Sequence, residues 1–111
     1  MNMQVPLELT LKDIPDSAEI EEIIHGRIEK LEKIYDNIIS CRVAVEKILK
    51  DQQSGNPFRI RLNLRVPKNH EIVIKREPGG NNDFNNLGAM VRDAFDTAQR
   101  QLKELSEKKR T

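Results

Sequence analysis

The side chains of this 111-residue sequence that could do catalytic or metal chemistry are few and widely spaced. His25 and His70 are the only histidines, and neither lies at a zinc-type spacing from Cys41, the only cysteine. Cys41 alternates with apolar neighbours, a pattern typical of a small core residue rather than a nucleophile. The pair Gly79-Gly80 is not followed by Lys-Ser or Lys-Thr, as a phosphate-binding loop would be. The sequence therefore predicts no enzyme, no metal site, no cofactor and no small-molecule substrate.

Basic side chains are the second group with chemical potential, because they bind phosphates. The net charge is only +1, but the charges are unevenly distributed along the chain. Up to Pro57 there are 7 basic and 11 acidic residues, whereas from Phe58 onward there are 12 basic and 7 acidic residues. Such segregation can make a basic surface on a nearly neutral protein. A chance imbalance on solvated faces is the alternative interpretation.

A first helical segment carries Arg27 and Lys30. At about 100° per residue, Arg27 points almost along the centre of the apolar stripe, and Lys30 flanks the same stripe. An arginine in that position must extend its head to solvent, pair with an acid or meet an anionic partner.

A second helical segment carries three further cations. Asp96 lies in the same polar arc and could pair with Arg92 or Arg100 at four-residue spacing, which is worth only about 0.3–0.5 kcal/mol when exposed. The alternative is that this helix presents its cations to a nucleic-acid backbone. If the two helices lie side by side, five residues form a predicted RNA-binding site along their groove: Arg27, Lys30, Arg92, Arg100 and Lys103.

Arg59, Arg61 and Arg65 alternate with apolar residues of a strand and should share the face opposite the core. They have two interpretations. They form either a charged open face that resists edge-to-edge association or a ladder of phosphate contacts. Base stacking on this sheet is not expected, because the sequence has no aromatic pair on a strand.

The elements that must position these residues follow from hydrophobic periodicity. Alternation with a period of two predicts strands over 5–11, 39–45, 58–66 and 70–75, with a short turn over 67–69. Apolar residues at three- and four-residue steps predict helices from Asp16 or Ser17 to Asp36–Asn37, and over 87–105. Because Pro6 cannot donate to a ladder, the first strand should lie at a sheet edge. Candidate caps of the second helix are Asp83, Asn85 and Asn86.

The order β-α-β-β-β-α predicts a two-layer α+β fold, with a four-stranded sheet and both helices on one face. The β-α-β unit implies parallel neighbouring strands, and the last three strands should form an antiparallel meander. Residues 1–107 are expected to form a single domain, followed by a basic C-terminal tail at 108–111. Without a signal peptide, a membrane-spanning stretch or a second cysteine, the chain is expected to be cytoplasmic and free of membrane partners.

Two segments resemble the family of short ribosome hibernation-promoting factors and ribosome-associated translation inhibitors, also called sigma-54 modulation proteins. The first runs from Arg27-Ile28-Glu29-Lys30-Leu31-Glu32 through Tyr35-Asp36 into the apolar strand that ends at Val43. The second is Val91-Arg92-Asp93-Ala94-Phe95-Asp96-Thr97-Ala98-Gln99-Arg100-Gln101-Leu102-Lys103. The likeness covers nearly the whole chain, and its specificity comes from the two segments in the right order.

This resemblance implies a fold related to double-stranded-RNA-binding domains, and a factor that docks on the small ribosomal subunit and its rRNA in the mRNA/tRNA region. Such factors silence idle ribosomes in stationary phase or stress. By position, Arg27 and Lys30 match basic sites of the family's first helix, and Arg100 matches one of its second helix. The chain departs from the family at 86–88, which lacks a tyrosine, and at Thr97, where lysine is frequent. The rival functions are a structured-RNA-binding module that acts off the ribosome and a protein-interaction domain.

Overall fold

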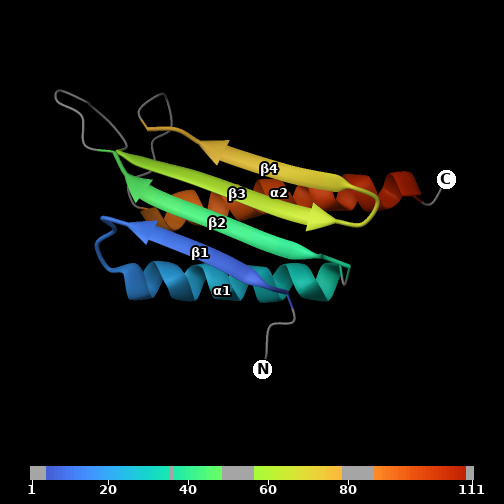
Figure 1. Ribbon diagram of the computed structural model, residues 1–111, viewed down its shortest axis with the longest axis horizontal. Coiled ribbons are helices and arrows are strands. Elements are labelled where there is room, and N and C mark those ends of the chain that lie inside the picture. The colour runs from blue at the N-terminus through green and yellow to red at the C-terminus, as the bar shows by residue number, and fades with distance from the viewer. Residues whose placement is uncertain (1–4, 36, 49–56, 79–86, 110–111) are drawn as a thin grey trace.

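The computed structural model describes residues 5–35, 37–48, 57–78 and 87–109. Its elements follow the predicted order β-α-β-β-β-α (Figure 1). They are β1 (Leu7–Lys12), α1 (Ser17–Ile34), β2 (Ser40–Lys47), β3 (Phe58–Val66), β4 (His70–Arg76) and α2 (Leu87–Lys109). The α+β class predicted from periodicity is confirmed.

The four strands form one sheet in the order β1-β2-β3-β4. Strand β1 pairs parallel with β2, with Leu7 opposite Cys41, and β2, β3 and β4 form an antiparallel meander. The predicted edge position of the first strand is therefore confirmed. Pro6 lies just outside β1, and its carbonyl accepts a hydrogen bond of 3.0 Å from the backbone N–H of Cys41.

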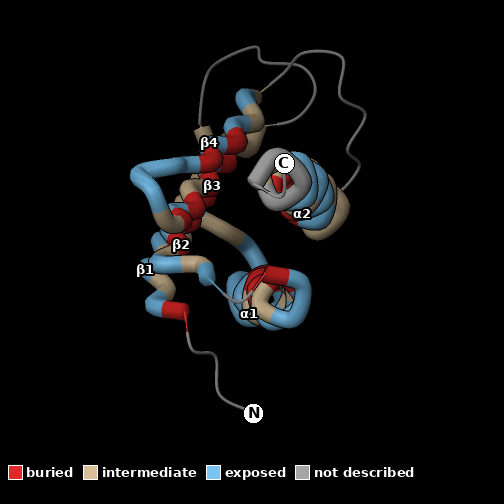
Figure 2. Tube along the Cα trace, turned by 90° about the vertical axis from the view of Figure 1, so that its right-hand side faces the viewer, coloured by how far each residue is buried: buried red, intermediate tan, exposed pale blue. Residues whose placement is uncertain are grey.

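Both helices lie on the same face of the sheet, as the view along them in Figure 2 shows. The core fills the space between the two layers. Its largest buried side chains include Phe95 and Met90 from α2, Ile24 and Ile28 from α1, and Leu62 from β3. Because alternate strand residues point inward, every second side chain of the sheet lies on the opposite, uncovered face.

The boundaries of α1 differ slightly from those predicted. The helix ends at Ile34, and not at Asp36–Asn37, because Tyr35 turns to extended backbone while its N–H donates to the Leu31 carbonyl. Asp16 is the N-cap residue, but it is left-handed with φ 54° and its side chain makes no capping hydrogen bond. The candidate caps of α2 lie outside the described residues.

Two isoleucines assigned to the apolar faces are exposed instead. Ile34 is 45% exposed at the end of α1, and Ile39 is 51% exposed just before β2. The predicted turn at 67–69 is confirmed, with Lys68 and Asn69 in the left-handed region at φ 68° and 60°.

Candidate nucleic-acid interface

Helices α1 and α2 are neighbours that run in the same direction across the sheet (Figures 1 and 2). An ion pair joins them: Arg27 Nη1 of α1 lies 2.6 Å from Asp96 Oδ1 of α2. This contact aligns the two helices, so that positions following Arg27 lie beside positions following Asp96. The side-by-side placement of the two helices, on which the predicted site depends, is therefore confirmed.

The partner of Asp96 differs from the partners considered from sequence. Those were Arg92 and Arg100 on its own helix, whereas the structure pairs it with Arg27 across the groove. Of the three outcomes open to Arg27, the structure shows pairing with an acid. The Arg27 side chain is 22% exposed and that of Asp96 is 61% exposed, so the pair is partly open to solvent.

The other four predicted site residues are exposed on the two helices. Among the side chains that the structure describes, which on α2 are those of residues 87–105, none of the four forms an ion pair with an acid. At 1.5 Å of rise per residue, Lys30 lies about 4.5 Å beyond Arg27, and Arg100 lies about 6 Å beyond Asp96. Lys30 and Arg100 are therefore almost level on neighbouring helices. Lys103 lies about one turn further along α2, and Arg92 about one turn before Asp96.

A polar contact that sequence reasoning missed fixes α2 to β4. Arg76 Nε donates to Asp93 Oδ2 at 3.0 Å, and Arg76 Nη2 donates to Thr97 Oγ1 at 2.9 Å. A lysine at position 97 would bring a second cation to the Arg76 guanidinium, whereas Thr97 accepts its hydrogen bond and so helps to anchor α2. No single-sequence signal connects residues 76 and 97, because their contact depends on how α2 sits over β4.

The residues first considered for catalysis are not arranged for it. Cys41 is 2% exposed, which confirms the prediction of a core residue, and burial raises the pKa of its thiol from 9.0 to about 12. His25 has Glu21 as its neighbour, at 4.0 Å one turn away on α1. Within the described ranges, no group of three His, Cys, Asp or Glu side chains is placed to hold a metal ion.

None of the helices, as far as they are described, is long and apolar enough to cross a membrane.

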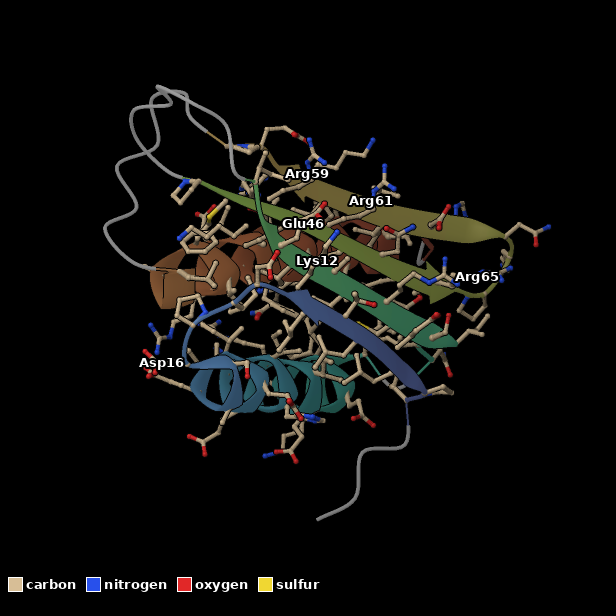
Figure 3. All side chains as sticks on the ribbon, turned by 60° about the vertical axis from the view of Figure 1, so that its left-hand side comes forward. Lys12, Asp16, Glu46, Arg59, Arg61 and Arg65 are labelled. Carbon is tan, nitrogen blue, oxygen red and sulfur yellow. The ribbon has the colours of Figure 1, made fainter. Side chains whose placement is uncertain are left out.

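The strand arginines are placed as their alternation predicts. Figure 3 shows Arg59, Arg61 and Arg65 spaced along β3 on the side of the sheet that faces away from α2. They lie opposite the helix groove, so the molecule has cations on both of its broad faces.

The fold and the exposed helix cations define a small two-layer α+β domain with a parallel helix pair. Residues 7–110 match the family described as Sigma 54 modulation protein / S30EA ribosomal protein, and the chain belongs to this family. It is therefore a member of a family of ribosome-associated factors rather than of enzymes, as the resemblance implied.

Two solved structures share the fold. A ribosomal subunit interface protein from Coxiella burnetii is 12% identical, with a TM-score of 0.69 over 93% of this chain and 99% of that one. The N-terminal domain of Protein Y from Thermus thermophilus is 15% identical, with a TM-score of 0.61 over 91% of this chain and 99% of that one. No curated protein sequence matches the chain.

Proposed function

We propose that this chain binds the small ribosomal subunit through its helix pair, in the region used by mRNA and tRNA, and thereby inhibits translation in idle or stressed cells. The carrying observation is the set of exposed helix cations without acidic partners among the described residues: Lys30, Arg92, Arg100 and Lys103. Arg27 is the fifth member, held at the groove by Asp96. Membership in the family supports rRNA in the cytoplasm as the ligand.

The mechanism is binding without chemistry. Each lysine or arginine that meets a phosphate releases condensed counterions, so the affinity must fall as the salt concentration rises. Helices without stacking aromatics read shape and phosphates rather than base sequence. Inhibition then follows from occupancy, because a domain seated where mRNA and tRNA bind excludes both.

The first test removes the unpaired helix cations. A Lys30→Ala/Arg100→Ala/Lys103→Ala variant should fold normally but pellet with small subunits far less than the wild-type chain at moderate salt. Lys33→Ala/Lys47→Ala/Lys68→Ala is the matched control, because it removes three cations that are not among the predicted site residues. Equal pelleting of the two triple variants would refute the helix pair as the binding surface.

A second test addresses the place on the subunit. Adding the protein to small subunits should reduce formation of complexes with mRNA and initiator tRNA in proportion to its occupancy. On sucrose gradients of stationary-phase lysate, the chain should migrate with ribosomal particles. Binding that leaves mRNA and tRNA unaffected would refute the proposed region, and a chain that stays at the gradient top would indicate an RNA-binding or protein-binding module acting off the ribosome.

A further inference from the structure

The outer face of the sheet, opposite the helices, carries a mixture of cations and carboxylates. Among the described residues, six cations point outward from this face: Lys12, Arg42, Arg59, Arg61, Arg65 and Lys75. Four carboxylates share the face with them: Glu8, Glu46, Glu71 and Glu77. No described element covers it, as Figure 2 shows.

Two of the outer-face cations are neutralised within the molecule. Arg42 Nε lies 3.0 Å from Glu8 Oε1. Arg59 contacts two acids, with Nη1 at 3.4 Å from Glu46 Oε1 and Nε at 3.1 Å from Glu77 Oε1. A face that served only to repel other sheet edges could pair all of its charges in this manner.

Arg61 and Lys75 break that pattern. They lie directly opposite each other on β3 and β4, both are exposed, and neither forms an ion pair with any described acid. Like charges directly opposite on neighbouring strands destabilise a sheet. The next side chain in the row is Ala44 of β2, which lies opposite Arg61 and leaves the two cations uncovered. This arrangement has a stability cost that an external anion would remove.

Arg65 is a third outer-face cation whose charge is not neutralised within the described part of the molecule. Its cross-strand neighbour is Glu71, yet Glu71 Oε2 accepts a hydrogen bond of 2.8 Å from Asn63 Nδ2. Arg65 forms no ion pair with any described acid. Arg61 and Arg65 are four residue steps apart on one strand and are therefore separated by about 13 Å. Three unpaired cations therefore line one stretch of the open face.

The acceptor oxygen of Asn63 is a second, independent observation. Asn63 Oδ1 is buried and has no hydrogen-bond partner, while its Nδ2 is committed to Glu71. Asn63, Arg65 and Arg42 line a hollow of about 470 Å³ on this face. Glu8 and Glu71 also line it, and they are engaged by Arg42 and Asn63 respectively. A buried unpaired acceptor costs free energy, so the site favours a ligand that brings a hydrogen-bond donor.

We propose that the outer sheet face is a second RNA-contacting surface, with phosphates against Arg61, Lys75 and Arg65 and a ribose hydroxyl or base amino group donating to Asn63. A nucleotide supplies both the anion and the donor, which this site requires together. The inference rests on the proposed function, because the RNA is taken to be rRNA. It adds that the domain contacts RNA on both broad faces rather than on its helices alone.

The test compares two double variants with the same loss of charge. Arg61→Gln/Lys75→Gln removes unpaired cations from the outer face, whereas Lys33→Gln/Lys47→Gln removes two cations that do not point outward from this face. Binding to small subunits is measured by pelleting over a series of salt concentrations. Each lost phosphate contact should flatten the log–log salt dependence by about 0.7 to 0.9, so the first variant should lose roughly 1.5 units. The second should keep the wild-type slope.

A stability measurement separates a binding role from a structural one. Because Arg61→Gln/Lys75→Gln removes a repulsion, its melting temperature should equal or exceed that of the wild-type chain while its affinity falls. If the wild-type chain pellets and both double variants keep its affinity and slope, the inference is overturned while the proposed function stands. A wild-type chain that does not pellet overturns both.

A crosslink identifies the class of partner. Val73 lies opposite Asn63 and is 41% exposed on the outer face. A photoreactive phenylalanine analogue at this position should crosslink to rRNA when the protein is bound to small subunits. Crosslinks to ribosomal proteins alone would overturn the inference in favour of an acidic protein partner.

Discussion

Asp96 determines how much of the positive charge of Arg27 is available to a phosphate. The carboxylate lies 2.6 Å from the guanidinium and is itself 61% exposed, so it competes with any phosphate that approaches the groove. Asp96→Asn should therefore tighten binding to small subunits. An exposed ion pair is worth about 0.2–1 kcal/mol, which corresponds to a gain of about 1.4-fold to fivefold in affinity.

The matched control for this prediction is Glu104→Gln, which removes one exposed carboxylate from the same helix without touching Arg27. Filter binding or pelleting at several salt concentrations measures both variants. Weaker binding by Asp96→Asn would mean that Asp96 positions Arg27 for RNA rather than competing for it. An equal gain in the two variants would assign the effect to net charge.

Cys41 yields a prediction about pH. Burial raises the pKa of its thiol from 9.0 to about 12, so at pH 8 the thiolate fraction is about a thousandfold smaller than in the unfolded chain. Alkylation by iodoacetamide, followed by mass spectrometry, should be very slow in the native protein and fast in guanidinium chloride. The thiol has the higher pKa in the native protein, so the alkylation rate of the native protein should keep rising above pH 9. The alkylation rate of the unfolded chain should level off there. Rapid native labelling at pH 8 would contradict the buried thiol.

At the scale of elements, Gly26 weakens α1. It lies within the helix, and a Cβ placed there would have no heavy atom within 4 Å. Gly26→Ala should therefore raise the free energy of unfolding by about 0.5–1 kcal/mol, because alanine loses less backbone entropy on folding. Urea denaturation measures the change, and Gly26→Ser should give a smaller gain. A loss of stability in Gly26→Ala would show that this helix surface is not open.

Arg76 connects β4 to α2 through Asp93 and Thr97. Its side chain is only 22% exposed, so its loss leaves polar groups of a partly covered contact without partners. Arg76→Ala should lower the free energy of unfolding by about 1–2 kcal/mol. Arg65→Ala is the control, because this arginine is exposed and forms no ion pair with any described acid; its stability should change by less than about 0.5 kcal/mol. Equal effects of the two changes would contradict an anchoring role for Arg76.

Element order, strand pairing and the single covered face were all predictable from sequence, because each depends on a local period of two or of 3.6 residues. The three arginines of β3 were assigned to the correct face on the same basis. What periodicity does not contain is the offset between two helices or between a helix and a strand. The contacts of Asp96 with Arg27, and of Arg76 with Thr97, depend on those offsets and were therefore missed or assigned to the wrong partner.

At the scale of the whole molecule, the two sets of unpaired cations lie on opposite faces of a thin domain. Its shortest dimension is 20 Å, whereas charges are screened over about 8 Å at physiological ionic strength. Lys30, Arg100 and Lys103 on the helices are thus electrostatically independent of Arg61 and Lys75 on the sheet. No described acidic side chain forms an ion pair that links the helix cations to the sheet cations.

This separation leads to a prediction for the combined variant. Losses in binding free energy should add when Lys30→Ala/Arg100→Ala/Lys103→Ala and Arg61→Gln/Lys75→Gln are joined, because distant sites without shared partners couple by less than about 0.5 kcal/mol. Pelleting at a salt concentration where every variant still binds measures the cycle. A domain that binds one RNA surface through its helices alone would instead show no loss from the sheet changes in either background. A coupling well above 0.5 kcal/mol would mean that the two faces do not bind independently, and that binding on one face alters the placement of the other.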